Sequence, residues 1–437
     1  MKRLVLLFEI FLFAANSFCY GQTNETKLSA SEKAYILSRF CTEIKYNFAF
    51  FDKLQCNWDS LCASLMPIMV NTASDEDFVK EMQALCARLH DGHTYIFLNN
   101  NPANGEDWIR PFPMKTKRIG DRVFVSEVYS SKLHNSGVSR GCEIIEIDGE
   151  KVLDYAATHI QPYLSSSTPQ WTKFRPFAEF ELTKAKGSKV SKILFRNQKG
   201  TEFVIESNRN ISWDLSKNSA SLSLEVLRGN IGLLKVSSFQ DSDFDRALFD
   251  KLYKQILETD ALIIDIRDNG GGNSAHADYL ISHLCADPIL QGRWKSPMYI
   301  AAHASWGRSP EWYSQIAESI LPVEGKDIYD KPIVLLVNST TFSSAENFCI
   351  SFKGAKRGKI IGTPTGGSTG NPIFIDLGGG ISCGICTKYE FDVEGNDFIG
   401  VGIQPDIVVE EDVDLFMKDE DNVVEKALNI IECSRKG

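Results

Sequence analysis

The second half of the chain alternates predicted strands and helices, and this alternation constrains the fold most. Residues 231–236 and 261–266 are short apolar runs typical of buried strands, with an amphipathic helix predicted between them at 244–258. Another buried strand is predicted at 333–337, and a helix follows it directly. Such alternation favours a largely parallel sheet whose strands are joined by crossover helices.

Two regions of different periodicity precede this α/β half. Residues from about 29 to 88 carry apolar side chains at helical spacing and predict a helical region. From about 110 to 208 the apolar period changes to two, with turn residues at Asp148-Gly149 and at 197–200, which is typical of antiparallel strands. We therefore expect an α/β core, a small β-rich domain and an N-terminal helical region.

Composition narrows the class of function. The chain has 437 residues, of which 43% are hydrophobic and 24% charged, values typical of a folded soluble protein with two or three domains. Its 47 basic and 57 acidic residues give a net charge of −10, with no long basic run. Nucleic-acid binding demands concentrated positive charge, so we expect no nucleic-acid partner.

Residues 1–21 have the order of a secretory signal peptide. Lys2 and Arg3 precede the apolar run 4–15, and the small residues Cys19 and Gly21 follow it. The run is too short to span a bilayer, and no later segment is apolar for long enough to do so. We therefore expect an exported protein, located in the periplasm, at the cell surface or in the medium. A buried N-terminal helix is the alternative interpretation.

The cysteines favour structural roles. Ten lie beyond Cys19, and export permits disulfides among them. Cys383 and Cys386 form a single Cys-x-x-Cys pair, which without a second ligand pair is weak evidence for zinc binding or redox chemistry. No metal or organic cofactor is expected.

Ser343 lies on a predicted turn between the buried strand and the following helix. This position exposes its hydroxyl at the carboxyl end of the sheet and directs the amide of Ser344 out of the helix N-terminus, where a developing oxyanion is favoured. The alternative is a capping box, because Glu346 follows Ser343 at the required spacing.

Two further segments suggest a site for acyl transfer. Gly270, Gly271 and Gly272 follow a buried strand, where they let backbone amides approach a ligand. A dinucleotide site is disfavoured, since Gly-x-Gly-x-x-Gly is absent. His93 follows the helix-breaking Gly92 and is our candidate base for a serine nucleophile. The rival histidines are His90, His276 and His303.

In this order, the segments resemble the C-terminal processing peptidase and tricorn-core family of serine peptidases. The motifs are Asp-Ile-Arg-Asp-Asn-Gly-Gly-Gly at 265–272, Thr-Phe-Ser-Ser-Ala-Glu at 341–346 and Gly-Ile-Gln-Pro-Asp-Ile at 402–407. The segment 136–149 is similar to part of a PDZ domain. After the signal peptide at 1–21, the resemblance implies a helical region at 22–100, a PDZ-like domain at 110–208 and a crotonase-like catalytic core at 215–437.

The same resemblance implies roles for individual residues. Ser343 would be the nucleophile, and the amides of Gly271 and Ser344 would form the oxyanion hole. The processing-peptidase branch takes a lysine base from the glycine-rich loop, where this chain has Ser368. The tricorn-like branch takes its base from the N-terminal histidine motif, which indicates His93.

Two positions depart from the tricorn-like pattern. Gly92 stands where that branch often has a serine, and Ile399 stands where it has a glutamate. Glu394 or Asp397 is our candidate for the acid that orients His93.

The sequence thus predicts an exported serine endopeptidase that acts on extended or unfolded polypeptide and needs no cofactor. It specifies no oligomeric state. The alternative is a catalytically silent protein that binds peptides or small ligands on the same scaffold, as expected if His93 lies far from Ser343 with no acid behind it. An α/β hydrolase for esters is disfavoured, because the Gly-x-Ser-x-Gly elbow is absent.

Overall fold

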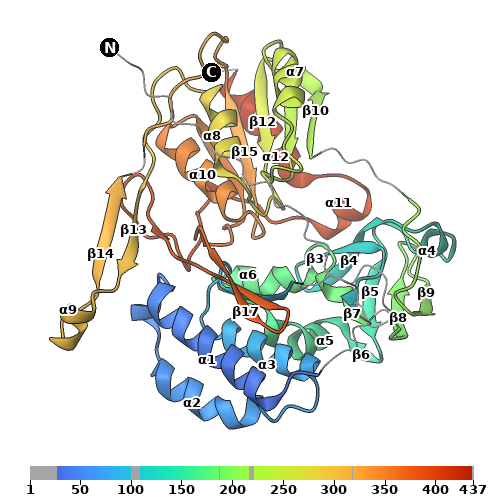
Figure 1. Cartoon of the computed structure of the whole chain (residues 1–437). Coiled ribbons are helices and arrows are strands. Elements are labelled where there is room, and N and C mark those ends of the chain that lie inside the picture. The colour runs from blue at the N-terminus through green and yellow to red at the C-terminus, as the bar shows by residue number, and fades with distance from the viewer. Residues whose placement is uncertain (1–26, 100–108, 187, 216–220, 317, 436–437) are drawn as a thin grey trace, which may run out of the picture.

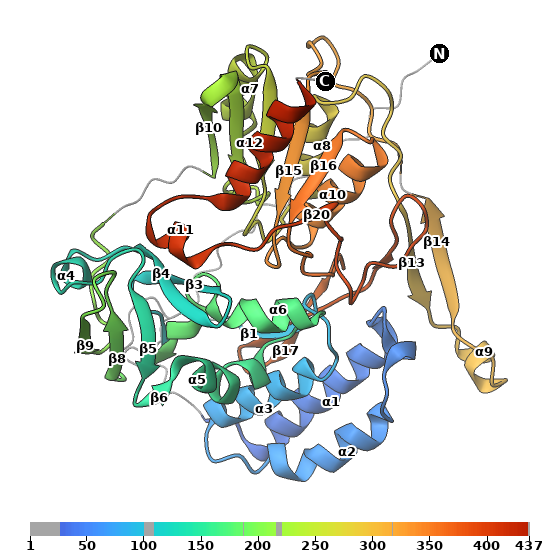
Figure 2. The same ribbon diagram turned by 180° about the vertical axis from the view of Figure 1, so that it is seen from behind.

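The computed structural model describes residues 27–99, 109–186, 188–215, 221–316 and 318–435. The predicted signal peptide at 1–21 lies outside the described residues. Figures 1 and 2 show an α/β unit, a group of helices and a β-rich unit arranged around a central region.

A six-stranded sheet forms the centre of the α/β unit. Its strands, in spatial order, are β10 (Leu222–Leu227), β11 (Ile231–Val236), β12 (Ala261–Asp265), β15 (Ile333–Val337), β16 (Gly358–Gly362) and β20 (Ile407–Val408). Only the pairing of β10 with β11 is antiparallel. The helices are α7 (Arg246–Ile256), α8 (Ser274–Ser282) and α10 (Ser344–Gly354) on one face and α12 (Asn422–Ser434) on the other (Figures 1 and 2). The predicted mixed α/β core is confirmed.

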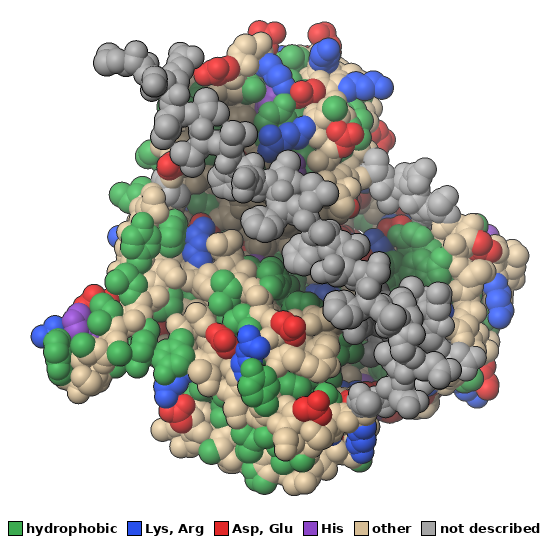
Figure 3. Space-filling model, in the orientation of Figure 1, with side chains coloured by type: hydrophobic (Ala, Val, Ile, Leu, Met, Phe, Trp, Pro, Cys, Tyr) green, Lys and Arg blue, Asp and Glu red, His purple; other side chains and the backbone are tan. Residues whose placement is uncertain are grey.

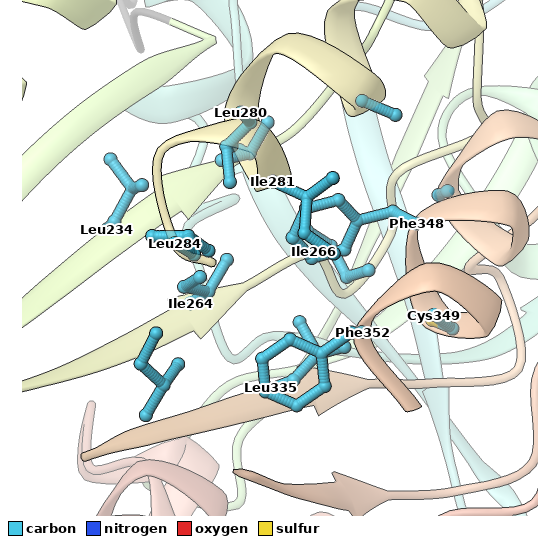
Figure 4. Packing of buried hydrophobic residues seen from close by; sticks show 14 of the residues in the cluster. Leu234, Ile264, Ile266, Leu280, Ile281, Leu284, Leu335, Phe348, Cys349 and Phe352 are labelled. Atoms are coloured by element: carbon cyan, nitrogen blue, oxygen red, sulfur yellow. The ribbon is translucent and has the colours of Figure 1, made fainter. Parts of the chain in front are cut away.

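Helices on both faces explain why the central strands are apolar throughout. Every residue of β12 and β15 is buried. Side chains on one face, such as Ile264 and Leu335, pack with Phe348 of α10 (Figure 4), and those on the other pack with Leu428 of α12. Helix α7 is shorter than the predicted 244–258, because the Asp245 side chain caps its first turn.

The N-terminal helices pack on a sheet contributed mainly by the C-terminal half. They are α1 (Ala30–Asn47), α2 (Trp58–Met69) and α3 (Asp75–Ala87), and the sheet has the order β1 (Tyr95–Leu98), β18 (Ile381–Ile385), β17 (Ile373–Gly378). A disulfide between Cys41 and Cys62 joins α1 to α2. Because β1 pairs with β18, the loop that follows α3 is held against the second half of the chain.

The β-rich unit contains the strands predicted by the two-residue period. They are β3 (Met114–Ile119), β4 (Arg122–Val128), β5 (Glu143–Ile147), β6 (Glu150–Lys151), β8 (Ser191–Arg196) and β9 (Glu202–Ser207). Its shorter elements are β2 (Ile109–Arg110), β7 (Ala185–Lys186), α4 (Ser131–Asn135) and α5 (Val152–His159), and α11 (Val413–Met417) packs against it. Asp148 and Gly149 both have positive φ, as a tight hairpin turn requires. Helix α6 (Pro169–Phe174) lies between this unit and the α/β unit (Figure 2).

A hairpin projects from the α/β unit. It consists of β13 (Arg293–Met298) and β14 (Glu311–Ile316), with α9 (Ala301–Ser305) at its end, and β13 also pairs with β19 (Tyr389–Glu390). Figure 3 shows many apolar side chains on this projection. Its exposed apolar residues include Trp306 and Ile316. Among the described residues no helix is both long and apolar enough to cross a membrane.

Candidate active site

Ser343 occupies a sharp turn between β15 and α10. Its backbone has φ 58° and ψ −125°, a conformation that non-glycine residues rarely adopt and that is often found at functional sites. The turn is held by the Ser343 N–H, which lies 3.2 Å from the Ser368 carbonyl oxygen and 3.3 Å from the Glu346 carboxylate. The Glu346 carboxylate therefore accepts from the Ser343 amide, as in a capping box, while the hydroxyl of Ser343 faces His93.

The imidazole of His93 lies directly against this hydroxyl. Its Nε2 is 2.9 Å from Ser343 Oγ, although the two residues are 250 positions apart. The ring stacks on Phe342 with 4.5 Å between centroids, and Phe342 stacks in turn on Trp171 of α6 at 4.3 Å. Gly370 packs so closely that an added Cβ would lie 2.8 Å from His93 Cβ. These neighbours fix the position of the imidazole.

The second nitrogen of His93 is oriented by a serine and an aspartate. Nδ1 lies 2.8 Å from Ser368 Oγ, and this hydroxyl donates to Asp91 Oδ1 at 2.9 Å. All three residues are buried, and the Thr94 hydroxyl also donates to Asp91. Since the Ser368 hydroxyl proton is donated to Asp91, the serine oxygen accepts a hydrogen bond from the Nδ1–H group of His93. Nε2 is then unprotonated and can accept the proton of Ser343.

Burial keeps this histidine neutral. Loss of solvation lowers the pKa of His93, and the negative charges of Asp91 and Glu390 oppose the shift without reversing it. A neutral imidazole at neutral pH is the state that a general base requires.

Glu346 ties the serine turn to the glycine-rich loop that carries Ser368. One carboxylate oxygen accepts from the Thr365 hydroxyl at 2.5 Å and the Gly367 amide at 2.8 Å; the other accepts from the amides of Ser368 at 2.9 Å and Ser343 at 3.3 Å. Burial raises the pKa of Glu346 to about 7, although these four donors act in the opposite direction. The carboxyl group therefore fixes the spacing between Ser343 and Ser368.

The predicted oxyanion residues lie beside the nucleophile. A Cβ added to Gly271, whose φ is +93°, would stand 2.6 Å from Ser343 Cβ and 3.0 Å from the Ser344 nitrogen. As the first residue of α10, Ser344 has an amide with no intrahelical acceptor. The Gly271 amide donates to Asn269 Oδ1 at 2.9 Å.

The candidate acids Glu394 and Asp397 are not brought to His93. The Glu394 carboxylate accepts from Asn396 at 3.1 Å, and Asp397 is paired with Tyr389 and Lys53. Ser368 occupies the position beside Nδ1 instead.

The rival histidines lie elsewhere. His90 is exposed, His276 is paired with Asp241, and His303 pairs with Glu311 on the projecting hairpin.

The two departures from the tricorn-like pattern have physical explanations. At position 92 a side chain would meet the Phe342 ring at 2.8 Å, so the stack on His93 leaves room for glycine alone. Ile399 packs against two apolar clusters, and Asp91 supplies a negative charge behind the histidine instead.

Sequence reasoning missed three residues of this arrangement. Asp91 and Ser368 were not assigned a role in orienting His93, because their contact depends on tertiary packing between segments 277 residues apart. Trp171 gave no signal, since an aromatic residue in a short helix has many structural explanations.

The described part of the chain contains no group of three His, Cys, Asp or Glu side chains arranged to hold a metal ion. Cys383 and Cys386 are both buried and unpaired, and burial raises the pKa of Cys383 to about 12. Both are therefore thiols within the apolar packing of β18 and its neighbours.

A serine on a strained strand-to-helix turn, a buried histidine and a glycine-rich turn together define a serine-hydrolase type of site. Comparisons with known proteins identify similar domains and folds. Residues 230–409 match the model of peptidase family S41. The carboxy-terminal-processing protease of Bartonella bacilliformis is 28% identical over 194 residues, which cover 42% of this chain and 40% of that protein. This chain thus matches less than half the length of that relative.

Two solved structures share the fold over most of the chain. Mature CPAF in complex with lactacystin superposes with a TM-score of 0.71 at 15% identity, covering 93% of this chain and 98% of the other. Mature CPAF alone gives 0.69 at 16% identity, covering 89% and 94%. The family match applies to residues 230–409, which carry a domain of peptidase family S41, a family of serine-type peptidases, and the resemblance inferred from sequence is confirmed for this domain.

Proposed function

We propose that this protein is an exported serine endopeptidase that hydrolyses peptide bonds of extended or unfolded polypeptides. The observation that carries the proposal is the row of contacts Ser343–His93–Ser368–Asp91, with successive distances of 2.9, 2.8 and 2.9 Å. Asp91 and Ser368 act as positioning residues, because they fix the tautomer of His93 without touching the nucleophile.

In the acylation step, Ser343 Oγ forms a bond to the scissile carbonyl carbon as its proton moves to His93 Nε2. The carbonyl π electrons move to oxygen and give a tetrahedral oxyanion. When they return, the carbon–nitrogen bond breaks, and His93 gives its proton to the leaving amine nitrogen. A water molecule then attacks the acyl-enzyme, loses a proton to His93 and releases the carboxyl product. Ser343 recovers its proton from His93.

The oxyanion is held by two amides. Ser344 N–H is the principal donor, because it is the free first amide of α10 and lies at the positive end of that helix. Gly271 N–H is the second donor and exchanges its bond to Asn269 for one to the oxyanion.

Two further predictions belong to this proposal. The residues at 110–208 form a PDZ-like domain, for which the antiparallel strands β3 to β9 are the support, and such a domain binds extended peptide along a strand edge. Export is supported by the Cys41–Cys62 disulfide, since disulfides persist in oxidising compartments.

The silent binding protein receives no comparable support. That alternative predicts that His93 lies far from Ser343 and has no acid behind it. In the structure the His93 imidazole is within hydrogen-bond distance of the Ser343 hydroxyl, and Asp91 accepts from the Ser368 hydroxyl behind the ring.

The test uses purified mature protein and a mixed library of unstructured peptides, with products identified by mass spectrometry. Cleavage is expected from the wild type and not from the folded Ser343→Ala variant. His93→Ala should also abolish it. If neither wild type nor variant cleaves any peptide while both are folded, the proposal fails.

A further inference from the structure

A small cavity lies between α8 and α10, close to the reactive serine. Its volume is about 80 Å³. Six of the residues in its walls carry the argument: Asp278 of α8, Asn347 and Ser351 of α10, Gln291, Lys388 and Glu390. Acidic side chains in a pocket of this size can select a substrate side chain by charge.

Three observations connect this cavity to the active site. Asn347 follows Ser343 by four residues on α10, which is about 6 Å along a helix. The amide of Lys388 donates to the carbonyl of Gly370, the glycine that packs on His93. The charge of Glu390 also acts on the pKa of His93. A long side chain next to the scissile carbonyl can therefore reach the cavity.

The cavity carries more negative than positive charge. The Glu390 side chain is only 8% exposed, and one of its oxygens accepts from Lys388 Nζ at 3.1 Å. Its Oε2 is buried with no hydrogen-bond partner among the described residues. Asp278 accepts from the neutral Gln291 side chain at 3.1 Å. A buried carboxylate oxygen without a donor is unfavourable, so this arrangement favours a donor brought by a ligand.

The Asp278 carboxyl group is ionised at neutral pH. Burial raises the pKa of Asp278 to about 6, with a contribution from the nearby charge of Glu390, while Gln291 and Lys388 act to lower it. Two carboxylates against one ammonium leave an excess of one negative charge, which is the complement of one basic side chain.

We propose that the cavity between α8 and α10, the Asp278–Glu390 subsite, receives the side chain of a lysine or arginine next to the scissile bond. This inference rests on the proposed function and adds a substrate class to it. The ammonium or guanidinium group donates to Glu390 Oε2 and Asp278, which satisfies the unpartnered oxygen and neutralises the excess charge. The peptidase therefore cleaves extended chains preferentially beside basic residues.

The test measures kcat/KM for two quenched fluorescent peptides that are identical except for Lys or Gln at the residue before the scissile bond. The wild type should prefer the Lys peptide by about tenfold or more. Glu390→Gln and Asp278→Asn should each lower this ratio by about tenfold. The control Glu225→Gln, an exposed carboxylate on the edge strand β10, should leave the ratio unchanged. Circular dichroism checks that every variant is folded.

Each outcome separates the subsite from the peptidase itself. Ser343-dependent cleavage without a preference for Lys or Arg overturns the subsite and leaves the proposed function intact. If the wild type cleaves nothing, the proposed function fails, and the subsite is tested by anisotropy with the labelled Lys and Gln peptides and Ser343→Ala. Tighter binding of the Lys peptide that is lost on adding Glu390→Gln then supports the subsite, and equal affinities overturn it.

Discussion

The two sides of the active site are built in different ways. The nucleophile side is local, because β15, the turn and α10 follow one another in one continuous segment, with Ser343 at the start of the helix. The base side is assembled from His93 before β1, Ser368 in the glycine-rich loop and Trp171 in α6. One side is therefore fixed by local backbone geometry, and the other depends on how three separate regions pack.

This difference predicts different responses to mutation. A substitution on the nucleophile side shifts the backbone that carries Ser343 and should therefore lower kcat/KM strongly. A change on the base side alters the orientation of one ring that several neighbours already hold, so part of the activity should survive. Four predictions test this contrast, in order of decreasing expected effect.

Gly271→Ala should lower kcat/KM by about 10²- to 10³-fold. The new methyl group would lie 2.6 Å from Ser343 Cβ and 2.8 Å from the Phe342 carbonyl oxygen, so the turn must shift. Gly120→Ala is the control, because it also has positive φ but has no atom within 4 Å of the added Cβ. Equal activity of the two variants would contradict the close packing of Gly271 against the nucleophile.

Ser368→Ala and Asp91→Asn should each lower kcat by about tenfold to a hundredfold, with KM little changed. Both remove the same support for the His93 tautomer, so the double variant should lose little more than either single one. Steady-state kinetics of the four proteins measure this coupling. Independent, multiplicative losses would contradict a single row of contacts through Ser368.

The pH profile of kcat/KM should fall on the acid side with an apparent pKa below 6.5, the ordinary value for histidine. Burial disfavours the charged imidazole, so His93 remains an effective base to lower pH than an exposed histidine. Since the charge of Asp91 opposes this shift, Asp91→Asn should move the acid limb to still lower pH. A limb above 6.5 in the wild type would argue against His93 as the base.

Glu346→Gln should lower the free energy of unfolding by about 1–3 kcal/mol, because an amide NH₂ would face backbone donors. It should also change the pH dependence of stability. The folded-state pKa of Glu346, about 7, exceeds the ordinary value of 4.5, so the folded protein holds this proton more strongly. Its contribution to stability is present below pH 4.5 and is lost as pH rises through 7. Thermal unfolding between pH 4.5 and 8 measures both effects, and identical profiles for the two proteins would contradict them.

The sequence predicted those parts of the fold whose signals are local. The apolar runs of β12 and β15 and the periodic helix α10 are visible in the residues themselves, as is the turn that carries Ser343. His93 was identified because it follows the helix-breaking Gly92 and because its segment resembles the histidine motif of the tricorn-like branch. The structure places its Nε2 atom 2.9 Å from Ser343 Oγ, and the catalytic roles of both residues stay predictions.

The orienting group of His93 could not be read from sequence. Glu394 and Asp397 lie in the C-terminal half that carries the family motifs, but their side chains are paired with other residues. The contact between Asp91 and Ser368 forms because β1 pairs with β18 and so brings the histidine loop against the glycine-rich loop. Strand pairing over such a separation leaves no local pattern.

Labelling by a fluorophosphonate tests whether Ser343 is the nucleophile and whether His93 activates it. We predict one adduct per chain, located on Ser343 by peptide mapping, and a rate of labelling that falls by at least about a hundredfold in His93→Ala. An adduct on another residue, or a labelling rate that does not depend on His93, would contradict the account.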